Sequence, residues 1–357
     1  MTDAGEATGP GPRDAPVRAP GHDPEPFPAP SHGSRGEPPV VLAVDSGGSG
    51  LRAVLARGTE VLGEPVVSGE AVRTGARGID AGHLLERLLP MARRLVHDAG
   101  CGRPVAVAVG AAGFATLGEQ LRAELPSALT RELGVSRVAL VADAVAAYTG
   151  ALGARPGAVI AAGTGLIAIG TDLESWRRAD GWGHLLGDCG GGAWIGRAGL
   201  EAALRAYDGR TGGSARLLAR AQELFGPMDG LPGRLYPRSD RPAVLASFAP
   251  EVAACAGDDP VAADILREAA RHMADAAAAV CPASGEPRVA LAGGLFKLGD
   301  ALLVPLEAEL AERLPHALRV SAEGDPLVGA VRIAAALAGG GLGLPYDERM
   351  LYVMAEK

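Results

Sequence analysis

The amino-acid sequence predicts an α/β protein made of two related domains with a cleft between them. The chain has 357 residues, which is enough for two domains of ordinary size. Short apolar runs typical of buried strands alternate with longer segments of helical periodicity. A strand, a glycine-rich turn and a returning strand occur near residue 40 and again near residue 157, and this repetition indicates a duplication.

The first 39 residues are expected to form a disordered tail. They contain ten of the 27 prolines, several acidic residues and almost no large apolar side chains. Such a segment cannot bury enough apolar surface to offset the entropy lost on ordering. We therefore assign 1–39 to the tail, 40–150 to an N-terminal domain, 151–345 to a C-terminal domain and 346–357 to a segment that returns toward the N-terminal domain.

The N-terminal domain is read as three strands followed by alternating helices and strands. Its first two strands are apolar runs separated by a glycine-rich segment over 45–50, which we interpret as a β-turn. Leucines recurring at helical intervals indicate the first helix. In chain order the expected elements are strands over 40–44 and 52–56, a helix over 78–99, and strands over 104–109 and 138–142.

The C-terminal domain begins with a second hairpin whose turn is Gly163-Thr164-Gly165. Helical stretches follow, then a further strand that enters Gly293-Gly294, and a last helix. The expected elements are strands over 158–162 and 166–170, helices over 194–207, 243–255 and 260–280, a strand over 288–292 and a helix over 325–338.

Composition excludes several classes of partner. The net charge of -8 and the pI of about 5.5 leave no basic field for a nucleic acid. No apolar run reaches the roughly 18 residues of a membrane span, and no secretory signal is present, so a cytoplasmic location is expected. The four cysteines show no C-x-x-C spacing, which argues against a disulfide framework or zinc cluster.

A Walker A phosphate loop is also excluded. That loop needs a Gly-Lys-Ser/Thr sequence. The only lysines are Lys297, which Leu298 follows, and Lys357 at the end of the sequence. A protein with this sequence would have to bind ATP by another architecture.

Glycine turns at strand ends are candidate phosphate sites, because glycine lets a ligand approach the backbone N–H groups closely. Any single turn could equally be a hairpin that uses glycine for a positive φ. Two such turns occur in matching strand contexts, and Gly293-Gly294 follows a third strand; together they resemble the phosphate loops of the actin-like ATPase superfamily, which implies a nucleotide site. The candidate nucleotide-binding residues are Gly47, Gly48, Ser49, Gly163, Thr164, Gly165, Gly293 and Gly294.

The most distinctive segment is 181–196, which begins Gly-Trp-Gly, continues through Gly187-Asp188-Cys189-Gly190 and contains a second Trp. It resembles the signature of the N-acetylglucosamine kinase family, within the actin-like ATPase (ribonuclease H-like) superfamily. The resemblance extends over about 40–345. It includes Asp45-Ser46-Gly47-Gly48-Ser49, Val141-Ala142-Asp143-Ala144, Gly163-Thr164-Gly165 and the segment 325–330.

The resemblance implies ATP and Mg²⁺ as cofactors and a sugar as the substrate. Asp143 would deprotonate the attacking sugar hydroxyl, and Asp45 would hold Mg²⁺ through water. The adenosine would lie against Gly293-Gly294. The residues implied to line the sugar are Gly75, Gly181, Trp182, Gly183 and Asp188. Without the resemblance, Asp143 could be a helix N-cap, Asp45 an Asx-turn residue and Trp182 part of the core.

Several positions depart from the family pattern. Leu166 and Ile167 stand where Ser and Asn are common, Gly75 stands in place of Asn, and Cys189 replaces Glu. A site that loses polar contacts discriminates its ligand differently. We therefore expect an altered acceptor, such as a muramic-type sugar whose apolar substituent Leu166 would contact.

Two other functions stay open. The chain also resembles ATPases that activate a CoA-ester reductase or dehydratase, which share the fold and bridge an iron–sulfur cluster between subunits with two cysteines per chain, one of them followed by Gly. Cys101-Gly102 and Cys189-Gly190 offer that dipeptide. The chain could also be a non-catalytic sugar sensor, although no basic helix-turn-helix precedes Val40. A homodimer is compatible with the sequence.

Overall fold

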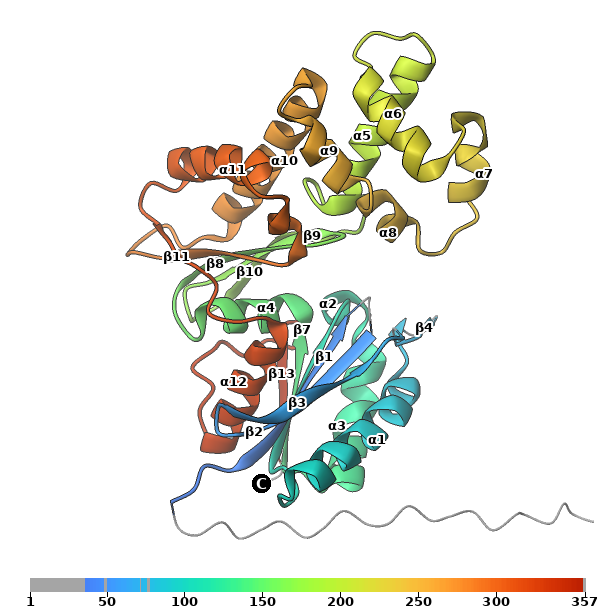
Figure 1. Cartoon of the computed structure of the whole chain (residues 1–357). Coiled ribbons are helices and arrows are strands. Elements are labelled where there is room, and N and C mark those ends of the chain that lie inside the picture. The colour runs from blue at the N-terminus through green and yellow to red at the C-terminus, as the bar shows by residue number, and fades with distance from the viewer. Residues whose placement is uncertain (1–35, 48–49, 71, 76–77, 356–357) are drawn as a thin grey trace, which may run out of the picture.

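We analysed a computed structural model, which describes residues 36–47, 50–70, 72–75 and 78–355. Two lobes, each built on its own β-sheet, lie one above the other (Figure 1). Most of the expected tail, together with Gly48 and Ser49, lies outside the described residues. No described helix is both long enough and apolar enough to cross a membrane.

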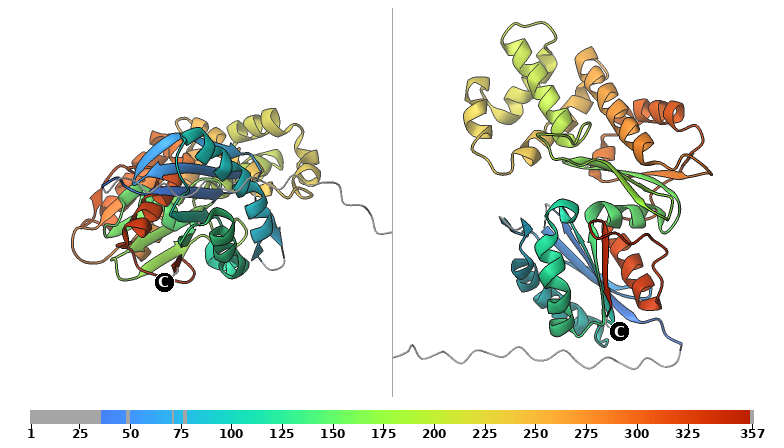
Figure 2. Two further views of the ribbon diagram at one scale, coloured as in Figure 1. Left: turned by 90° about the horizontal axis from the view of Figure 1, so that it is seen from below. Right: turned by 180° about the vertical axis from the view of Figure 1, so that it is seen from behind.

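The sheet of the first lobe has the strand order β13-β7-β6-β1-β2-β3. Strands β1, β6 and β7 are parallel, whereas β2, β3 and β13 run antiparallel to their neighbours. Helices α1 and α3 cover one face of this sheet and α12 covers the other (Figures 1 and 2). The bounds are β1 Val40–Gly47, β2 Gly50–Arg57, β3 Glu60–Ser68, β6 Ala106–Ala111, β7 Arg137–Ala142, β13 Leu351–Ala355, α1 Ala81–Ala99, α3 Glu119–Leu133 and α12 Pro326–Gly339.

The sheet of the second lobe has the order β10-β9-β8-β11-β12. Its strands are β8 Gly157–Ala162, β9 Leu166–Thr171, β10 Trp176–Asp180, β11 Arg288–Ala292 and β12 Leu318–Arg319. Because side chains alternate along a strand, the sheet separates two cores. In β9, Leu166 packs with the core of the outer helices, whereas Ile169 packs with the core that includes α4, Asp143–Leu152.

Helices of the second lobe lie beyond its sheet, on the side away from the first lobe (Figure 1). The helix expected over 243–255 is two helices, because Pro250 at the start of α9 cannot continue the hydrogen bonding of a preceding helix. The bounds are α5 Gly192–Tyr207, α6 Ala215–Phe225, η1 Met228–Gly230, α7 Leu231–Leu235, α8 Arg241–Ala246, α9 Ala249–Cys255, α10 Pro260–Val280, η2 Gly294–Leu298 and α11 Asp300–Arg313.

The two sheets share one connectivity, which confirms the predicted duplication. In the first, β3-β2-β1 form an antiparallel meander and β6 and β7 follow in parallel. In the second, β10-β9-β8 form the meander and β11 and β12 follow in parallel. The fold is therefore the predicted pair of related α/β domains. Short elements precede α1 and α3, namely β4 Thr74–Gly75, β5 Gly78–Ile79 and α2 Phe114–Leu117.

The chain crosses between the lobes more than once. Helix α12 falls within the range 151–345, yet it packs against β1, β6 and α4 of the first lobe. Strand β13 then pairs with β7. Helices α4 and α12 meet closely at two glycines: a Cβ on Gly329 would lie 1.8 Å from the carbonyl oxygen of Ala146, and a Cβ on Gly150 would lie 2.1 Å from that of Asp325.

The first prediction tests this helix contact. We expect Gly329→Ala to lower the free energy of unfolding by about 1–3 kcal/mol or more, because the added methyl group overlaps rigid backbone. Gly339→Ala is the matched control in the same helix, where a Cβ would meet no atom within 4 Å, and it should be neutral or stabilising by up to about 1 kcal/mol. Urea unfolding measures both. Equal unfolding midpoints would contradict the close packing of α4 on α12.

Candidate active site

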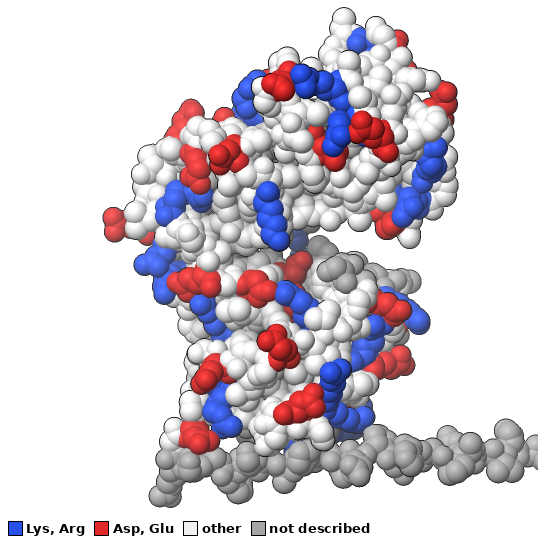
Figure 3. Space-filling model, in the orientation of Figure 1, with Lys and Arg blue, Asp and Glu red and all other residues white. Residues whose placement is uncertain are grey.

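The candidate site lies where the first lobe faces the second. The strands β1, β6 and β7 are parallel, so their carboxyl ends meet at one edge of the sheet, and Asp45 and Asp143 lie at that edge. The Gly163-Thr164-Gly165 turn belongs to the hairpin of β8 and β9 in the other lobe. Figure 3 shows the molecular surface hollowed between the two lobes.

Asp143 is the first residue of α4, directly after β7. The N-cap position is occupied by Ala142, so the alternative that Asp143 caps the helix is wrong. Its Oδ1 accepts a hydrogen bond from the N–H of Ala144 at 2.9 Å. Burial, aided by the negative charge of Asp45, raises the pKa of Asp143 to about 6. A carboxylate with this pKa can exchange a proton near neutral pH.

Asp45 is part of an ion-paired group. It lies within β1 opposite Arg52 of β2, and its Oδ2 accepts from Arg52 Nε at 3.1 Å and from Nη2 at 2.7 Å. Arg52 Nη1 also donates to Asp325 at 2.7 Å. The turn expected over 45–50 is shorter, because strand pairing continues to Gly47 and Gly50. Asp45 lies within the paired strand, so the Asx-turn alternative for it is wrong.

Asp45 has one carboxylate oxygen available to a metal ion or to its water ligands. Both hydrogen bonds from Arg52 go to Oδ2, and no described residue donates to Oδ1. Within the described part of the chain, no group of three His, Cys, Asp or Glu residues could hold a metal ion. This donor set fits Mg²⁺, which keeps several waters and needs few protein carboxylates.

The Gly163-Thr164-Gly165 turn is held against the start of α5. The carbonyls of Gly163 and Thr164 accept from the N–H groups of Gly192 and Ala193 at 2.9 and 2.8 Å. The N–H groups of Thr164 and Gly165 donate to no acceptor among the described residues. The surface above Gly163 is open, since a Cβ there would meet no atom within 4 Å. The Asp188 carboxylate lies against Gly165, so the space open to a phosphate is at the Gly163 end of the turn.

The candidate glycines differ in whether backbone conformation or a close contact requires a glycine at that position. Gly293 follows β11, the neighbour of β8, and its φ of 108° and close approach to the Ala162 carbonyl exclude other residues on structural grounds. Gly163 has no left-handed φ, so a positive φ does not explain it. Gly47 and Gly294 have open space where a Cβ would lie.

Two carboxylates hold the loop 181–191 together by accepting hydrogen bonds from its backbone N–H groups. Asp180, at the end of β10, accepts from the N–H groups of Asp188 at 2.6 Å and Cys189 at 2.8 Å. Asp188 in turn accepts from the N–H of Gly183 at 3.0 Å, and burial raises its pKa. Sequence reasoning missed Asp180, although an acid directly before Gly-Trp-Gly was the available signal.

Trp182 and Gly75 are both exposed. The core alternative for Trp182 is wrong, because 62% of the residue is accessible to solvent. Its ring stacks on the Arg178 guanidinium, whose Cζ lies 4.4 Å from the ring centroid. Gly75 lies in the short β4–β5 hairpin, and a Cβ there would meet no atom within 4 Å.

The expectation that Leu166 contacts an acceptor is wrong. Leu166 is only 2% exposed and packs in the core of the outer helices, because its side chain points to the face of the sheet away from α4. Ile167 points to the opposite face and is half-buried, and a Cβ on Gly181 would lie 2.8 Å from its Cδ1.

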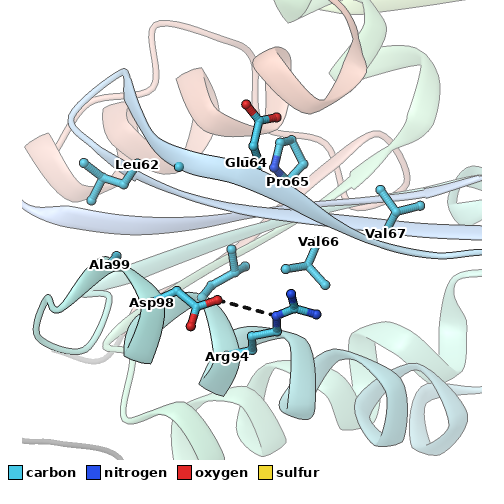
Figure 4. A pocket seen from close by; sticks show the side chains of 10 residues that line it. Leu62, Glu64, Pro65, Val66, Val67, Arg94, Asp98 and Ala99 are labelled. Atoms are coloured by element: carbon cyan, nitrogen blue, oxygen red, sulfur yellow. Dashed lines mark hydrogen bonds and ion pairs between the residues drawn. The ribbon is translucent and has the colours of Figure 1, made fainter.

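A separate hollow of about 540 Å³ lies on the first lobe between β3 and α1. It is lined by Leu62, Val66 and Val67 and bordered by the exposed Arg94–Asp98 ion pair (Figure 4). It contains none of the predicted site residues.

Comparisons with known proteins agree with this architecture. The BadF/BadG/BcrA/BcrD ATPase family matches residues 42–334. A proposed N-acetylglucosamine kinase from Chromobacterium violaceum is 28% identical, with a TM-score of 0.62, over 82% of this chain and 98% of that chain. A search of curated proteins finds no significant match.

Two further solved structures show the same fold. A proposed N-acetylglucosamine kinase from Porphyromonas gingivalis is 18% identical, with a TM-score of 0.63, over 84% of this chain and 99% of that chain. A ROK family glucokinase from Streptomyces griseus, in complex with glucose and AMPPNP, is 21% identical, with a TM-score of 0.53, over 84% of this chain and all of that chain (100%).

The second prediction tests the open space above Gly163. We expect Gly163→Val to weaken ATP binding at least about 10-fold without lowering the melting temperature, because the new Cβ meets no atom within 4 Å and the side chain fills space that a phosphate would need. Gly257→Val, at an equally open and unstrained glycine, is the control. Calorimetric titration with ATP measures the affinities, and unchanged affinity in Gly163→Val would place the nucleotide elsewhere.

Proposed function

The chain belongs to the BadF/BadG/BcrA/BcrD ATPase family, and from this premise we propose that it is a kinase that transfers the γ-phosphoryl group of ATP to an amino sugar. N-acetylglucosamine or a related sugar, including a muramic-type sugar, is the proposed acceptor. The observation that carries the proposal is Asp143, a single carboxylate with a pKa near 6 at the edge that faces the second lobe. This is the position and pKa that a general base for a sugar hydroxyl needs.

The roles follow from charge and placement. Asp143 orients the acceptor hydroxyl and takes its proton, since its Oδ2 receives no hydrogen bond from the described residues. Bound ATP would supply the phosphoryl group, with its phosphates at Gly47-Gly48-Ser49 and Gly163-Thr164-Gly165. Asp45 would hold Mg²⁺ through water, and Gly293-Gly294 would lie against the adenosine. Positioning and charge neutralisation provide most of the rate in such transfers.

The sugar side of the proposal rests on the segment 181–191. Asp188 would accept hydrogen bonds from sugar hydroxyls, while Gly181, Trp182 and Gly183 would line the ring. Open space at Gly75 would leave room for a substituent on the sugar. Because the Leu166 side chain is buried, it gives no preference for an apolar substituent.

The activator alternative receives no support from the cysteines. Iron–sulfur ligation needs thiolates. Burial raises the pKa of the Cys189 thiol, and the nearby carboxylates of Asp180 and Asp188 raise it further. Burial also raises the pKa of Cys101, which lies in the other lobe beyond the end of α1. The two Cys-Gly dipeptides thus lie in different lobes and do not form one pair of cluster ligands.

The third prediction tests the function and the base together. We expect the protein to consume ATP in the presence of N-acetylglucosamine or a muramic-type sugar, and Asp143→Asn to lower kcat by about 10²- to 10⁴-fold, because an amide cannot take the proton. Asp264→Asn, on the exposed side of α10, is the matched control and should leave kcat unchanged. A coupled assay of ADP release across a sugar panel measures both. More than about a tenth of the wild-type kcat in Asp143→Asn would contradict the base assignment.

The fourth prediction concerns pH. A general base works only when it is deprotonated, so kcat/KM should fall as pH drops below about 6, the pKa of Asp143 in the free protein, and reach a plateau above it. The charges that act on this carboxyl are Asp45 of β1, which raises the pKa, and Arg178 of β10, which lowers it. The measurement is kcat/KM for the sugar as a function of pH. A wild-type profile without an acidic limb would exclude Asp143 as the group that sets the rate.

A further inference from the structure

Arg178 is a cation of the second lobe on the face of the sheet that is directed toward the first. In β10, Trp176 packs edge-on against Tyr148 of α4, with ring centroids 5.3 Å apart. Side chains two residues apart share a face of a strand, so Arg178 lies on this α4 side. Arg177 lies on the opposite face and is exposed. The charge of Arg178 therefore acts across the interface where α4 begins with Asp143.

The guanidinium of Arg178 is held in place, but one of its nitrogen atoms has no hydrogen-bond partner among the described residues. It stacks on the Trp182 ring, with Cζ 4.4 Å from the centroid. Its Nη2 is buried and has no hydrogen-bond partner among the described residues. A buried donor without an acceptor is unfavourable, and an arginine cannot relieve this by losing a proton. Stacking on Trp182 therefore orients Arg178, and its Nη2 group lacks an acceptor.

An acceptor for this group could be an oxygen of a ligand that reacts beside Asp143, the proposed general base. Arg178 lowers the pKa of Asp143, although burial outweighs this effect, and no hydrogen bond joins the two side chains. A hydroxyl bound to Asp143 would lie about 2.6–3.2 Å from it. The phosphorus under attack would lie about 3–3.5 Å beyond that oxygen. Arg178 lies on the α4 side of β10, and α4 begins with Asp143, so the transferred phosphoryl group would lie between this carboxylate and the lobe that carries Arg178.

We propose that Arg178 donates its free N–H group to the phosphoryl group during transfer and that Trp182 positions the guanidinium. The proposal rests on the proposed kinase function. In the step, the sugar oxygen forms the new P–O bond and loses its proton to the Asp143 carboxylate. The bond between the γ-phosphorus and the bridging oxygen breaks, and ADP leaves with that electron pair. Arg178 keeps its protons and stabilises charge on the phosphoryl oxygens.

The fifth prediction compares Arg178→Met with Arg177→Met. We expect Arg178→Met to lower kcat by about 10²- to 10³-fold, as loss of one transition-state donor does, with the KM for the sugar changed only a few-fold. It should abolish binding of ADP with aluminium fluoride, a mimic of the transferring group, but leave ADP binding unchanged. Removing the cation should also move the acidic limb of the kcat/KM profile to higher pH. Arg177→Met should match the wild type in all five measurements.

Substitution of Trp182 separates positioning from charge. Trp182→Phe keeps an aromatic face under the guanidinium, whereas Trp182→Leu removes the cation–π contact, so Trp182→Leu should lower kcat about 10-fold more than Trp182→Phe.

Several results would overturn the inference. If Arg178→Met keeps kcat within about threefold, Arg178 does not act on the phosphoryl group. If it lowers the melting temperature and ADP binding along with kcat, and leaves the pH profile in place, its role is structural. If the wild type phosphorylates no sugar of the panel, the proposed function itself fails. With an active wild type, either of the first two results rejects this inference and leaves the proposed function in place.

Discussion

The close contact of α4 and α12 fixes the geometry on which the rest of the site depends. At Gly329 and Gly150 the two helices approach so closely that no side chain fits between them. Helix α4 begins with Asp143 and lies between the two sheets, while α12 begins at Asp325, whose carboxylate caps the helix and pairs with Arg52. A shift of either helix would therefore move a charged group at the edge of the first sheet.

The two carboxylates at that edge have opposite environments. Asp45 is ion-paired with Arg52 through two hydrogen bonds, so its charge is largely compensated. Asp143 is buried without a comparable partner, and its pKa rises to about 6. Burial therefore makes Asp143 the group able to exchange a proton near neutral pH.

The sequence could predict the features that depend on local pattern. Apolar runs and glycine turns located both hairpins and the strand that ends at Asp143, because strand periodicity is a short-range property. The Asp45–Arg52 ion pair depends on the register between β1 and β2. The unpaired Nη2 of Arg178 depends on how the Arg178 side chain packs against Trp182. Neither is visible without the fold. The packing of α12 against the first sheet was equally hidden, because its sequence position places it among elements of the second lobe.

Of the side chains that depart from the kinase pattern, Leu166 lies away from the site, and this changes what its departure implies. Leu166 is buried on the far side of its sheet, and the loop uses the backbone N–H of Cys189, which donates to Asp180. The segment 181–191 is thus shaped by backbone hydrogen bonds to Asp180 and Asp188, which changes at positions 166 and 189 need not disturb. Loss of polar side chains there is consequently weak evidence for a changed acceptor. Open space at Gly75, on the first lobe, remains the departure with a direct bearing on which sugar fits.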